Sequence, residues 1–200
     1  MVKNALDADE VRIKMKIYKL DAELNEYESF RLLNEDNIFI RNFRKEMSNG
    51  ERKNGKFDNL ELELIDSGKP SDLPQFWNFT GALIFSERAK NCLESYLEDC
   101  VEFILLKYHE VSYYLVNVIR IIDGIDYENA GFRKLDTGLV VGMDKYSFKE
   151  NEVKNVNMFK VLLNKRIYNS EIYVSSELKE RIEEFKLVGF KLTEMWDLDK

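Results

Sequence analysis

The sequence contains few of the residues that build metal sites and nucleophilic active sites. It has one histidine and two cysteines among 200 residues. Any Ser-His-Asp or Cys-His arrangement would have to use His109, and the residues around it match no known catalytic motif. One histidine and two helical cysteines also cannot supply the tetrahedral ligand set of a structural zinc site. We therefore predict no metal, no cofactor and no enzymatic activity, and we interpret His109 as an exposed residue in a turn.

Long apolar runs and a disulfide framework are missing as well. The first residues lack the apolar core of a secretory signal, and no apolar run reaches the roughly 20 residues that a membrane helix needs. Two cysteines do not form a framework in a chain of this length, so we expect Cys92 and Cys100 to be buried thiols. No glycine-rich phosphate loop is present, because Gly138 and Gly142 lie in a strand pattern. The sequence thus predicts a cytoplasmic protein without a membrane partner.

Positive charge is in the minority. The chain has a formal net charge of -7 and a pI near 5.0, whereas a protein that binds the phosphate backbone needs a basic face. We therefore expect no nucleic-acid partner, although an acidic chain suits a basic protein partner. The exception is the polar segment 41–56, whose cations could form a local anion site. We interpret this segment as a solvated loop or a hairpin tip.

The clearest local signal is a helix that begins after Ser86. A serine followed by Glu87 is a good N-cap, because its hydroxyl accepts a hydrogen bond from a free backbone N–H. Behind it, apolar residues recur at the spacing of one helix face. They are Ala89, Cys92, Leu93, Tyr96, Leu97 and Cys100. The pattern predicts an amphipathic helix that packs this stripe against a sheet.

Two apolar runs after this helix supply strands for the sheet. Residues 101–108 are almost wholly apolar, as in a strand that is covered on both faces. Residues 111–122 are rich in β-branched and aromatic side chains. His109-Glu110 between the two runs indicates a hairpin, and Asp123-Gly124 ends the second strand in a turn.

The remaining segments add strands and one further helix. Residues 11–18 alternate strictly between apolar and polar, which is the best strand pattern in the chain. Other strands are expected at 29–33, which 38–40 could extend, and at 60–64, 138–148, 158–163, 172–174 and 190–196. Ser176 is expected to cap a helix over 177–187 that Gly189 ends. This order of elements predicts an α+β fold, with a mostly antiparallel sheet and two main helices packed against it.

The densest carboxylate cluster beside a strand end is Asp123, Asp126 and Glu128. Paired carboxylates can hydrolyse glycosides or bind calcium, but these three lack the spacing of an EF-hand and share one turn. Three interpretations stay open: a solvated turn, an acidic patch that binds a partner, and a catalytic site. Glu150 and Glu152 would enlarge the patch if the fold brings them near.

Three aromatic residues, Phe76, Trp77 and Phe79, precede the predicted helix. They could form a platform for a ligand. We interpret them as a hydrophobic plug beneath the start of the helix.

Four stretches together resemble one protein family. They are FWNFTGALIFSERAKNCL, VEFILLKY, YYLVNVIRIIDGIDYENA and IYVSSELKERIEEFKLVGFKLTEMW. In this order they resemble an immunity protein family of bacterial polymorphic toxin systems, the eleventh so named. The resemblance covers about residues 60–196. We therefore divide the chain into an N-terminal part of strands and polar loop, 1–59, which joins the same fold, and an immunity-family core, 60–200.

The resemblance implies a function in protein binding. Proteins of that family are encoded beside a toxin and bind its toxic domain, so the implied role is stoichiometric neutralisation of a cognate toxin without catalysis. Asp123, Asp126 and Glu128 are candidate contacts to a partner because they form a cluster of carboxylates, and not because of the resemblance. The alternative function is a small cytoplasmic hydrolase that uses these three carboxylates.

Overall fold

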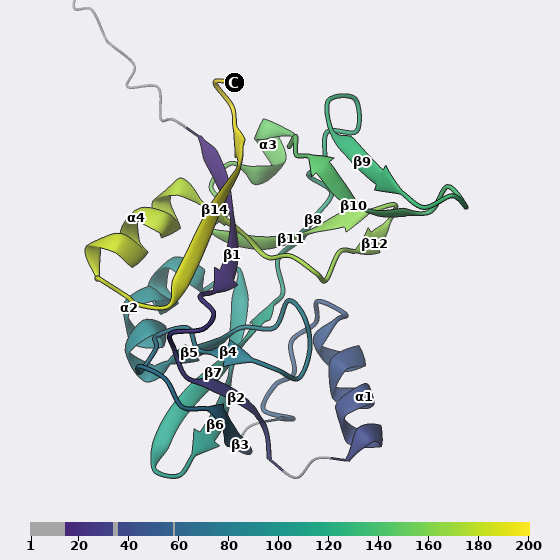
Figure 1. Ribbon diagram of the computed structural model, residues 1–200. Helices are drawn as coiled ribbons and strands as arrows, with labels where there is room; N and C mark the ends of the chain where they lie inside the picture. Colours follow the sequence, from purple (N-terminus) through teal and green to yellow (C-terminus); the bar gives the residue numbers. More distant parts are fainter. Residues whose placement is uncertain (1–14, 34–35, 58) are drawn as a thin grey trace, which may run out of the picture.

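A computed structural model describes residues 15–33, 36–57 and 59–200, and this part of the chain is built mainly of strands (Figure 1). Its fourteen strands form two six-stranded sheets and one two-stranded hairpin. The first sheet has the order β12-β11-β13-β1-β14, with β8 beside β11, and the second sheet has the order β4-β2-β3-β6-β7-β5. The first sheet contains β1 (Lys16–Ala22), β8 (Ile121–Ile122), β11 (Met158–Leu163), β12 (Arg166–Ile167), β13 (Tyr173–Ser175) and β14 (Phe190–Asp197). The second sheet contains β2 (Ser29–Leu32), β3 (Leu60–Asp66), β4 (Gln75–Phe76), β5 (Ile84–Ser86), β6 (Val101–Tyr108) and β7 (Val111–Val118). The hairpin is β9 (Gly131–Lys134) with β10 (Val140–Lys145), and the helices are α1 (Asn37–Met47), α2 (Glu87–Leu97), α3 (Glu150–Val153) and α4 (Ser176–Glu184).

The predicted α+β class, with one mostly antiparallel sheet and two main helices, is wrong. The four helices within the described ranges are short, at 11, 11, 4 and 9 residues, and strands predominate. The chain starts in the first sheet with β1, builds the second sheet from β2 to β7, and returns to the first sheet at β8. Local patterns indicate where strands occur but not which strands pair, so they cannot reveal this division into two sheets.

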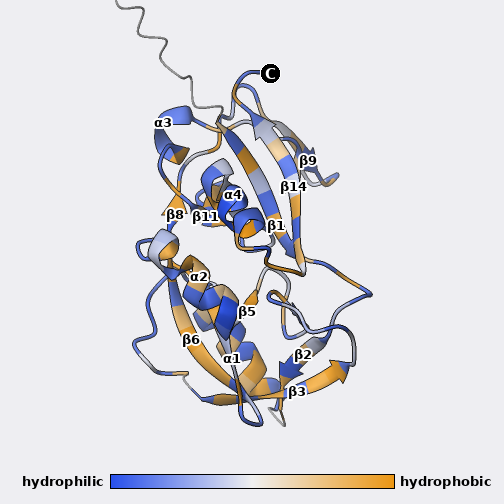
Figure 2. Cartoon of the chain, turned by 90° about the vertical axis from the view of Figure 1, so that its left-hand side faces the viewer, coloured by the Kyte–Doolittle hydropathy of each residue, from blue (hydrophilic) through white to orange (hydrophobic). Residues whose placement is uncertain are grey.

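The strand at 101–108 is covered on both faces, as predicted. β6 lies between β3 and β7 in the second sheet. Val101 belongs to the larger hydrophobic core, whereas Ile104 and Leu106 belong to a smaller core that also contains α1 residues. Because side chains alternate across a strand, these two cores lie on opposite faces of β6. Most of β6 is orange in the hydropathy view of Figure 2, in agreement with burial on both sides.

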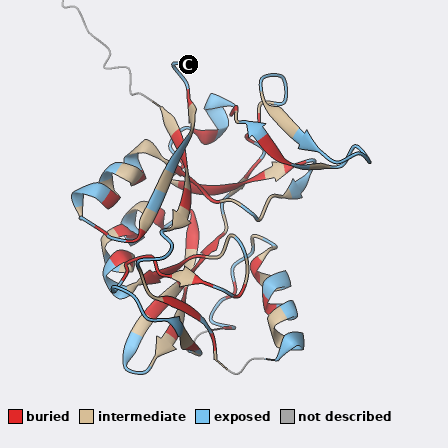
Figure 3. Cartoon of the chain, viewed as in Figure 1, coloured by how far each residue is buried: buried red, intermediate tan, exposed pale blue. Residues whose placement is uncertain are grey.

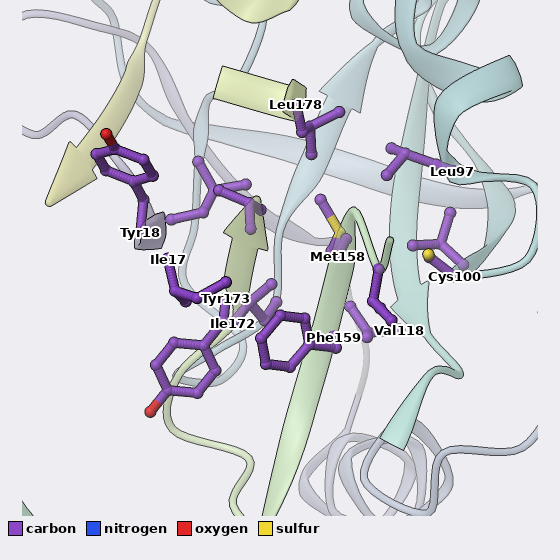
Figure 4. Packing of buried hydrophobic residues seen from close by; sticks show 14 of the residues in the cluster. Ile17, Tyr18, Leu97, Cys100, Val118, Met158, Phe159, Ile172, Tyr173 and Leu178 are labelled. Carbon is purple, nitrogen blue, oxygen red and sulfur yellow. The ribbon is translucent and has the colours of Figure 1, made fainter. Parts of the chain in front are cut away.

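The larger core forms where α2 and α4 meet the two sheets. The predicted stripe of α2 points into it, since Leu93 and Leu97 are both 0% exposed and Cys100 is buried. Figure 4 shows Leu97 and Cys100 on one side of this core, with Leu178 of α4 and Met158 of β11 across from them. The predicted helix register is therefore confirmed. Both cysteines are free thiols, but Cys92 is only half-buried, so the prediction of two buried thiols is correct for Cys100 alone.

The start of α2 is attached to the segment before it and to the end of α4. Ser86 caps the helix, as predicted, by accepting a hydrogen bond from the N–H of Ala89 at 3.0 Å. The buried carboxylate of Asp72 accepts hydrogen bonds from the Ser86 hydroxyl at 2.8 Å and from the Val188 N–H at 3.0 Å. It also forms an ion pair with Arg88, whose guanidinium donates to the carbonyl of Phe185 at 2.7 Å. Asp72 thus joins three separate segments of the chain.

Helix α1 (Asn37–Met47) replaces the predicted strand extension at 38–40 and the first part of the predicted loop at 41–56. The Asp36 carboxylate caps the helix by accepting from the N–H of Phe39 at 2.7 Å. Phe43 and Met47 are buried one turn apart, and they pack in the smaller core. The sequence pattern is misleading because Ile38 begins a run of three apolar residues, which is typical of a strand, although Ile38 is exposed in the helix.

The predicted strand at 111–122 is two strands that belong to different sheets. β7 ends at Val118, and the N–H groups of Ile119 and Arg120 both donate to the carbonyl of Cys100. The chain then crosses to the first sheet, where β8 pairs in parallel with β11. The continuous apolar pattern conceals this crossing because residues on both sides of it are buried.

The ends of the chain differ from prediction in detail. β1 begins at Lys16, and residues 11–14 of the predicted strand lie outside the described residues. Ile17 and Tyr18 are both buried because a bulge in the pairing with β14 separates them, which interrupts the alternation. The second long helix is capped by Ser175 instead of Ser176, and Lys186 with φ 51° follows its end in place of Gly189.

Candidate binding surface

The three predicted carboxylates lie in the turn between β8 and β9, but they play different parts. The carboxylate of Asp126 accepts hydrogen bonds from the Asn129 side-chain amide at 2.6 Å, from the Glu128 N–H at 3.1 Å and from the Ser147 hydroxyl at 3.4 Å. These bonds, the one from the Asn129 amide most of all, lower the pKa of Asp126. Asp123 and Glu128 are exposed. Asp126 therefore shapes the turn, while the other two carboxylates are available to a partner.

Helix α3 brings two further carboxylates to this turn. The N–H of Lys149 donates to the carbonyl of Gly124 at 2.8 Å, and its ammonium group donates to the carbonyl of Asp123 at 3.2 Å. Glu150 and Glu152 of α3 follow directly and are exposed. We refer to Asp123, Glu128, Glu150 and Glu152 as the acidic face.

Two hairpins next to the acidic face enclose a groove. The β9–β10 hairpin projects from the body of the molecule, and its outer part is pale blue in the burial view of Figure 3. Between it and the β11–β12 hairpin lies a groove of about 470 Å³. The lining residues are Leu139, Val140, Val141, Leu163, Asn164, Arg166, Ile167 and Tyr168. We refer to this as the hairpin groove.

Tyr127 connects the hairpin groove to the acidic turn. Its hydroxyl accepts a hydrogen bond from the N–H of Asn164 at 3.0 Å, in the turn between β11 and β12. Its ring stacks on Phe132 of β9, with 5.2 Å between ring centroids. One residue of the acidic turn therefore contacts both hairpins, so this turn lies beside the hairpins that enclose the groove.

The aromatic residues before α2 do not form a single plug. Phe76 is buried and Phe79 packs against the smaller core, whereas the buried residues of α2 belong to the larger core, so the predicted plug beneath that helix is wrong. Trp77 is instead 53% exposed. It lines a second groove, of about 480 Å³, together with Leu24, Thr80, Lys191 and other residues of β1, β4 and the loop before β5. Nothing in the sequence distinguishes the exposed Trp77 from the buried Phe76 and the half-buried Phe79.

The segment 41–56 could form an anion site, but the carboxylate of Glu102 already occupies its backbone donors. The carboxylate of Glu102 accepts hydrogen bonds from the N–H groups of Lys53 at 2.6 Å and Asn54 at 2.8 Å, and from the Asn117 amide at 3.0 Å. Burial raises the pKa of Glu102, but these hydrogen bonds outweigh burial and lower it. The Lys53 side chain is buried as well. The backbone donors of this segment therefore already hold an anion.

His109 is an exposed turn residue, as predicted. It stands between β6 and β7 with φ 51°, and its ring contacts that of Tyr108 at 4.5 Å. In residues 15–33, 36–57 and 59–200, no group of three or more His, Cys, Asp or Glu side chains is placed to hold a metal ion.

A buried lysine links the first sheet to the end of α1, and the sequence pattern did not indicate it. Lys160 of β11 is 4% exposed, and its ammonium group donates to the Asn169 side-chain oxygen at 3.0 Å. The Asn169 amide in turn donates to the carbonyl of Ser48, at the end of α1, at 3.1 Å. Burial lowers the pKa of Lys160 to about 8. The signal was a single cation inside the apolar run 158–163.

The free energy of unfolding should rise by about 1 kcal/mol between pH 7 and pH 9 because of Lys160. Its pKa in the folded protein, about 8, lies below the ordinary lysine value of 10.5. In this pH window the unfolded chain keeps the proton that the folded chain loses, so stability increases with pH. Urea denaturation at the two pH values measures the difference.

The Lys160→Met variant should lose this rise, whereas Lys154→Met, at an exposed lysine, should keep it. The same slope in wild type and Lys160→Met would show that Lys160 does not titrate in this window. The tyrosines with raised pKa values do not interfere, because they affect stability only near pH 10 and above.

Comparison with known proteins assigns the chain to a family. A model of an immunity protein family, Imm11, matches residues 12–197, which include every described strand and helix from β1 to β14. No curated protein matches the chain. None of the helices in the described part of the chain has the length and apolar character needed to cross a membrane. The matched region covers nearly the whole of the 200 residues, and the chain therefore belongs to the Imm11 immunity protein family.

Proposed function

We propose that this protein neutralises a cognate bacterial polymorphic toxin by direct, stoichiometric binding in the cytoplasm. The family match carries this proposal, because it spans both large sheets and the β9–β10 hairpin. The whole fold, and not one sheet, is then the unit that confers immunity. The acidic turn beside the two hairpins of the apolar groove supports binding of a protein, since such interfaces combine an apolar centre with a polar rim.

Co-expression with the toxin domain encoded beside the gene tests this function. We expect growth to be restored, and we expect the two purified chains to form an equimolar complex in light scattering. Protection by amounts of protein far below those of the toxin would contradict stoichiometric binding. That outcome would instead favour the hydrolase alternative, which uses Asp123, Asp126 and Glu128.

We propose that Asp123, Asp126 and Glu128 contribute to binding of a basic toxin surface. Asp126 holds the turn through its hydrogen bonds to Asn129 and Ser147, while Asp123 and Glu128 present charge. Exposed charges at the rim of an interface mainly steer association, and their effect is screened over a Debye length of about 8 Å at physiological salt.

The double variant Asp123→Asn/Glu128→Gln should therefore associate with the toxin domain about 2- to 5-fold more slowly at low salt, with a nearly unchanged dissociation rate. Stopped-flow binding at two salt concentrations measures this. The control Glu23→Gln/Glu110→Gln changes the net charge equally at exposed residues of other loops. Equal association rates for both double variants would mean that the acidic turn faces away from the toxin.

A further inference from the structure

We propose that the hairpin groove and the cations at its rim bind an apolar segment of the cognate toxin that carries carboxylates. This inference rests on the proposed function, and it names the contact surface and the chemistry of the partner. It concerns residues that the sequence did not indicate.

The first observation is exposed apolar surface on an isolated hairpin. Leu135, Leu139 and Val141 are 51%, 56% and 37% exposed, and β9 and β10 pair only with each other among the described strands. A two-stranded hairpin is marginally stable in water, so neighbouring apolar residues on its surface are costly unless something covers them. The groove beneath, lined by Leu163 and other residues of the second hairpin, provides the depth that an apolar anchor needs.

The second observation is positive charge at the edge of the groove. Lys134, Lys165 and Arg166 are exposed and form no ion pair with other described residues, whereas Arg133 lies 3.9 Å from Asp144. The chain as a whole has a net charge of -7. A local excess of unpaired cations in an acidic protein favours carboxylates on the partner at this position.

The third observation is the backbone of Lys165. Asn164 has φ 51° and Lys165 has φ 61°, and together they form the two-residue turn between β11 and β12. Such a turn favours glycine at its second position, because a side chain there is strained. The chain has lysine at that position, beside the groove. The side chain at this strained position is a cation, which adds to the positive charge beside the groove.

The neighbouring acidic face favours a protein over other anionic partners. Tyr127 keeps the acidic turn in contact with the β11–β12 turn. Nucleic acid or an anionic membrane that reached Lys165 would therefore also approach Glu128 and Asp123. A protein surface can place carboxylates opposite the cations and cations opposite the carboxylates, and this arrangement would fix its orientation.

The variant Lys165→Gly tests the proposal, with Lys186→Gly as its matched control. Lys186 has φ 51°, is exposed, and follows α4, which lies on the other side of the molecule from the β9–β10 hairpin in Figure 1. Both variants relieve a strained backbone, so both should melt at a higher temperature than wild type. Isothermal titration uses the toxin domain encoded by the neighbouring gene, inactivated by mutation, as the probe.

We expect Lys165→Gly to raise Kd about 5- to 10-fold and to weaken its salt dependence, and Lys186→Gly to bind like wild type. Leu139→Ser, which changes an exposed side chain, should raise Kd more than 10-fold and leave the melting temperature unchanged within about a degree.

Wild-type Kd values for both Lys165→Gly and Leu139→Ser would overturn the hairpin groove as the contact surface, while the proposed function would stand. Failure of wild type to bind the toxin domain would overturn the proposed function itself. If wild type bound anionic vesicles or RNA, and Lys165→Gly lost that binding while it kept the toxin, the groove would belong to another ligand and the proposal would be wrong.

Discussion

Replacing Leu93 with alanine should lower the free energy of unfolding by about 2–5 kcal/mol. Leu93 is 0% exposed and belongs to the α2 stripe in the larger core. The substitution removes buried apolar atoms and leaves a cavity, because α4 and both sheets hold the surrounding side chains in place. Urea denaturation followed by circular dichroism measures the change.

Asn91→Ala is the matched control for this substitution. Asn91 lies on the exposed side of α2, so its replacement should change stability by less than about 0.5 kcal/mol. If Leu93→Ala were as stable as wild type, the assignment of α2 to the centre of the core would be wrong.

Replacing Asp72 with alanine should lower the free energy of unfolding by about 3 kcal/mol. Asp72 is 5% exposed, and its carboxylate satisfies the Ser86 hydroxyl, the Val188 N–H and the Arg88 guanidinium. Removing it leaves a backbone donor and a hydroxyl without their partner. The Arg88 side chain is half exposed and can turn toward water, so the expected loss lies at the lower end for a broken buried ion pair.

Two further variants separate charge from hydrogen bonding at Asp72. Arg88→Ala should cost less than Asp72→Ala, because it leaves the Ser86 and Val188 contacts in place. Asp72→Asn should fall between wild type and Asp72→Ala, since one side-chain oxygen remains as an acceptor. Equal losses for Arg88→Ala and Asp72→Ala, measured by urea denaturation, would show that the ion pair alone matters.

The elements that could be predicted are those whose signals are local. The α2 helix has its cap at Ser86 and its stripe within the same short segment, and β6 and β7 are joined by a tight turn. α1 was not predicted because it buries mainly Phe43 and Met47, so a short apolar run outweighs the helical spacing. The division into two sheets could not be predicted, because it depends on pairings such as that of Leu60 with Leu106, which lie far apart in the chain.

The candidate binding surface could also be predicted from the sequence only in part. A cluster of carboxylates can be seen in the sequence, but the hydrogen bonds that distinguish Asp126 from Asp123 depend on Ser147 and on the fold of the turn. The hairpin groove combines side chains from β10 and from the β11–β12 turn, including Leu139 and Arg166, which no local pattern connects. Its one local signal was the pair Leu135 and Leu139 on either side of a turn that contains Gly138.

β1 has both of its neighbours at the opposite end of the chain. It pairs with β13 on one side and with β14 on the other, seen in Figure 1 as a purple strand beside a yellow one. During synthesis β1 leaves the ribosome long before either partner exists, whereas every strand of the second sheet has been made by residue 118. The second sheet can thus assemble on the nascent chain, but the first sheet closes only after the last strand is released. A chain that terminates before residue 190 would keep one edge of β1 open to aggregation, so only copies translated almost to the end can complete the first sheet.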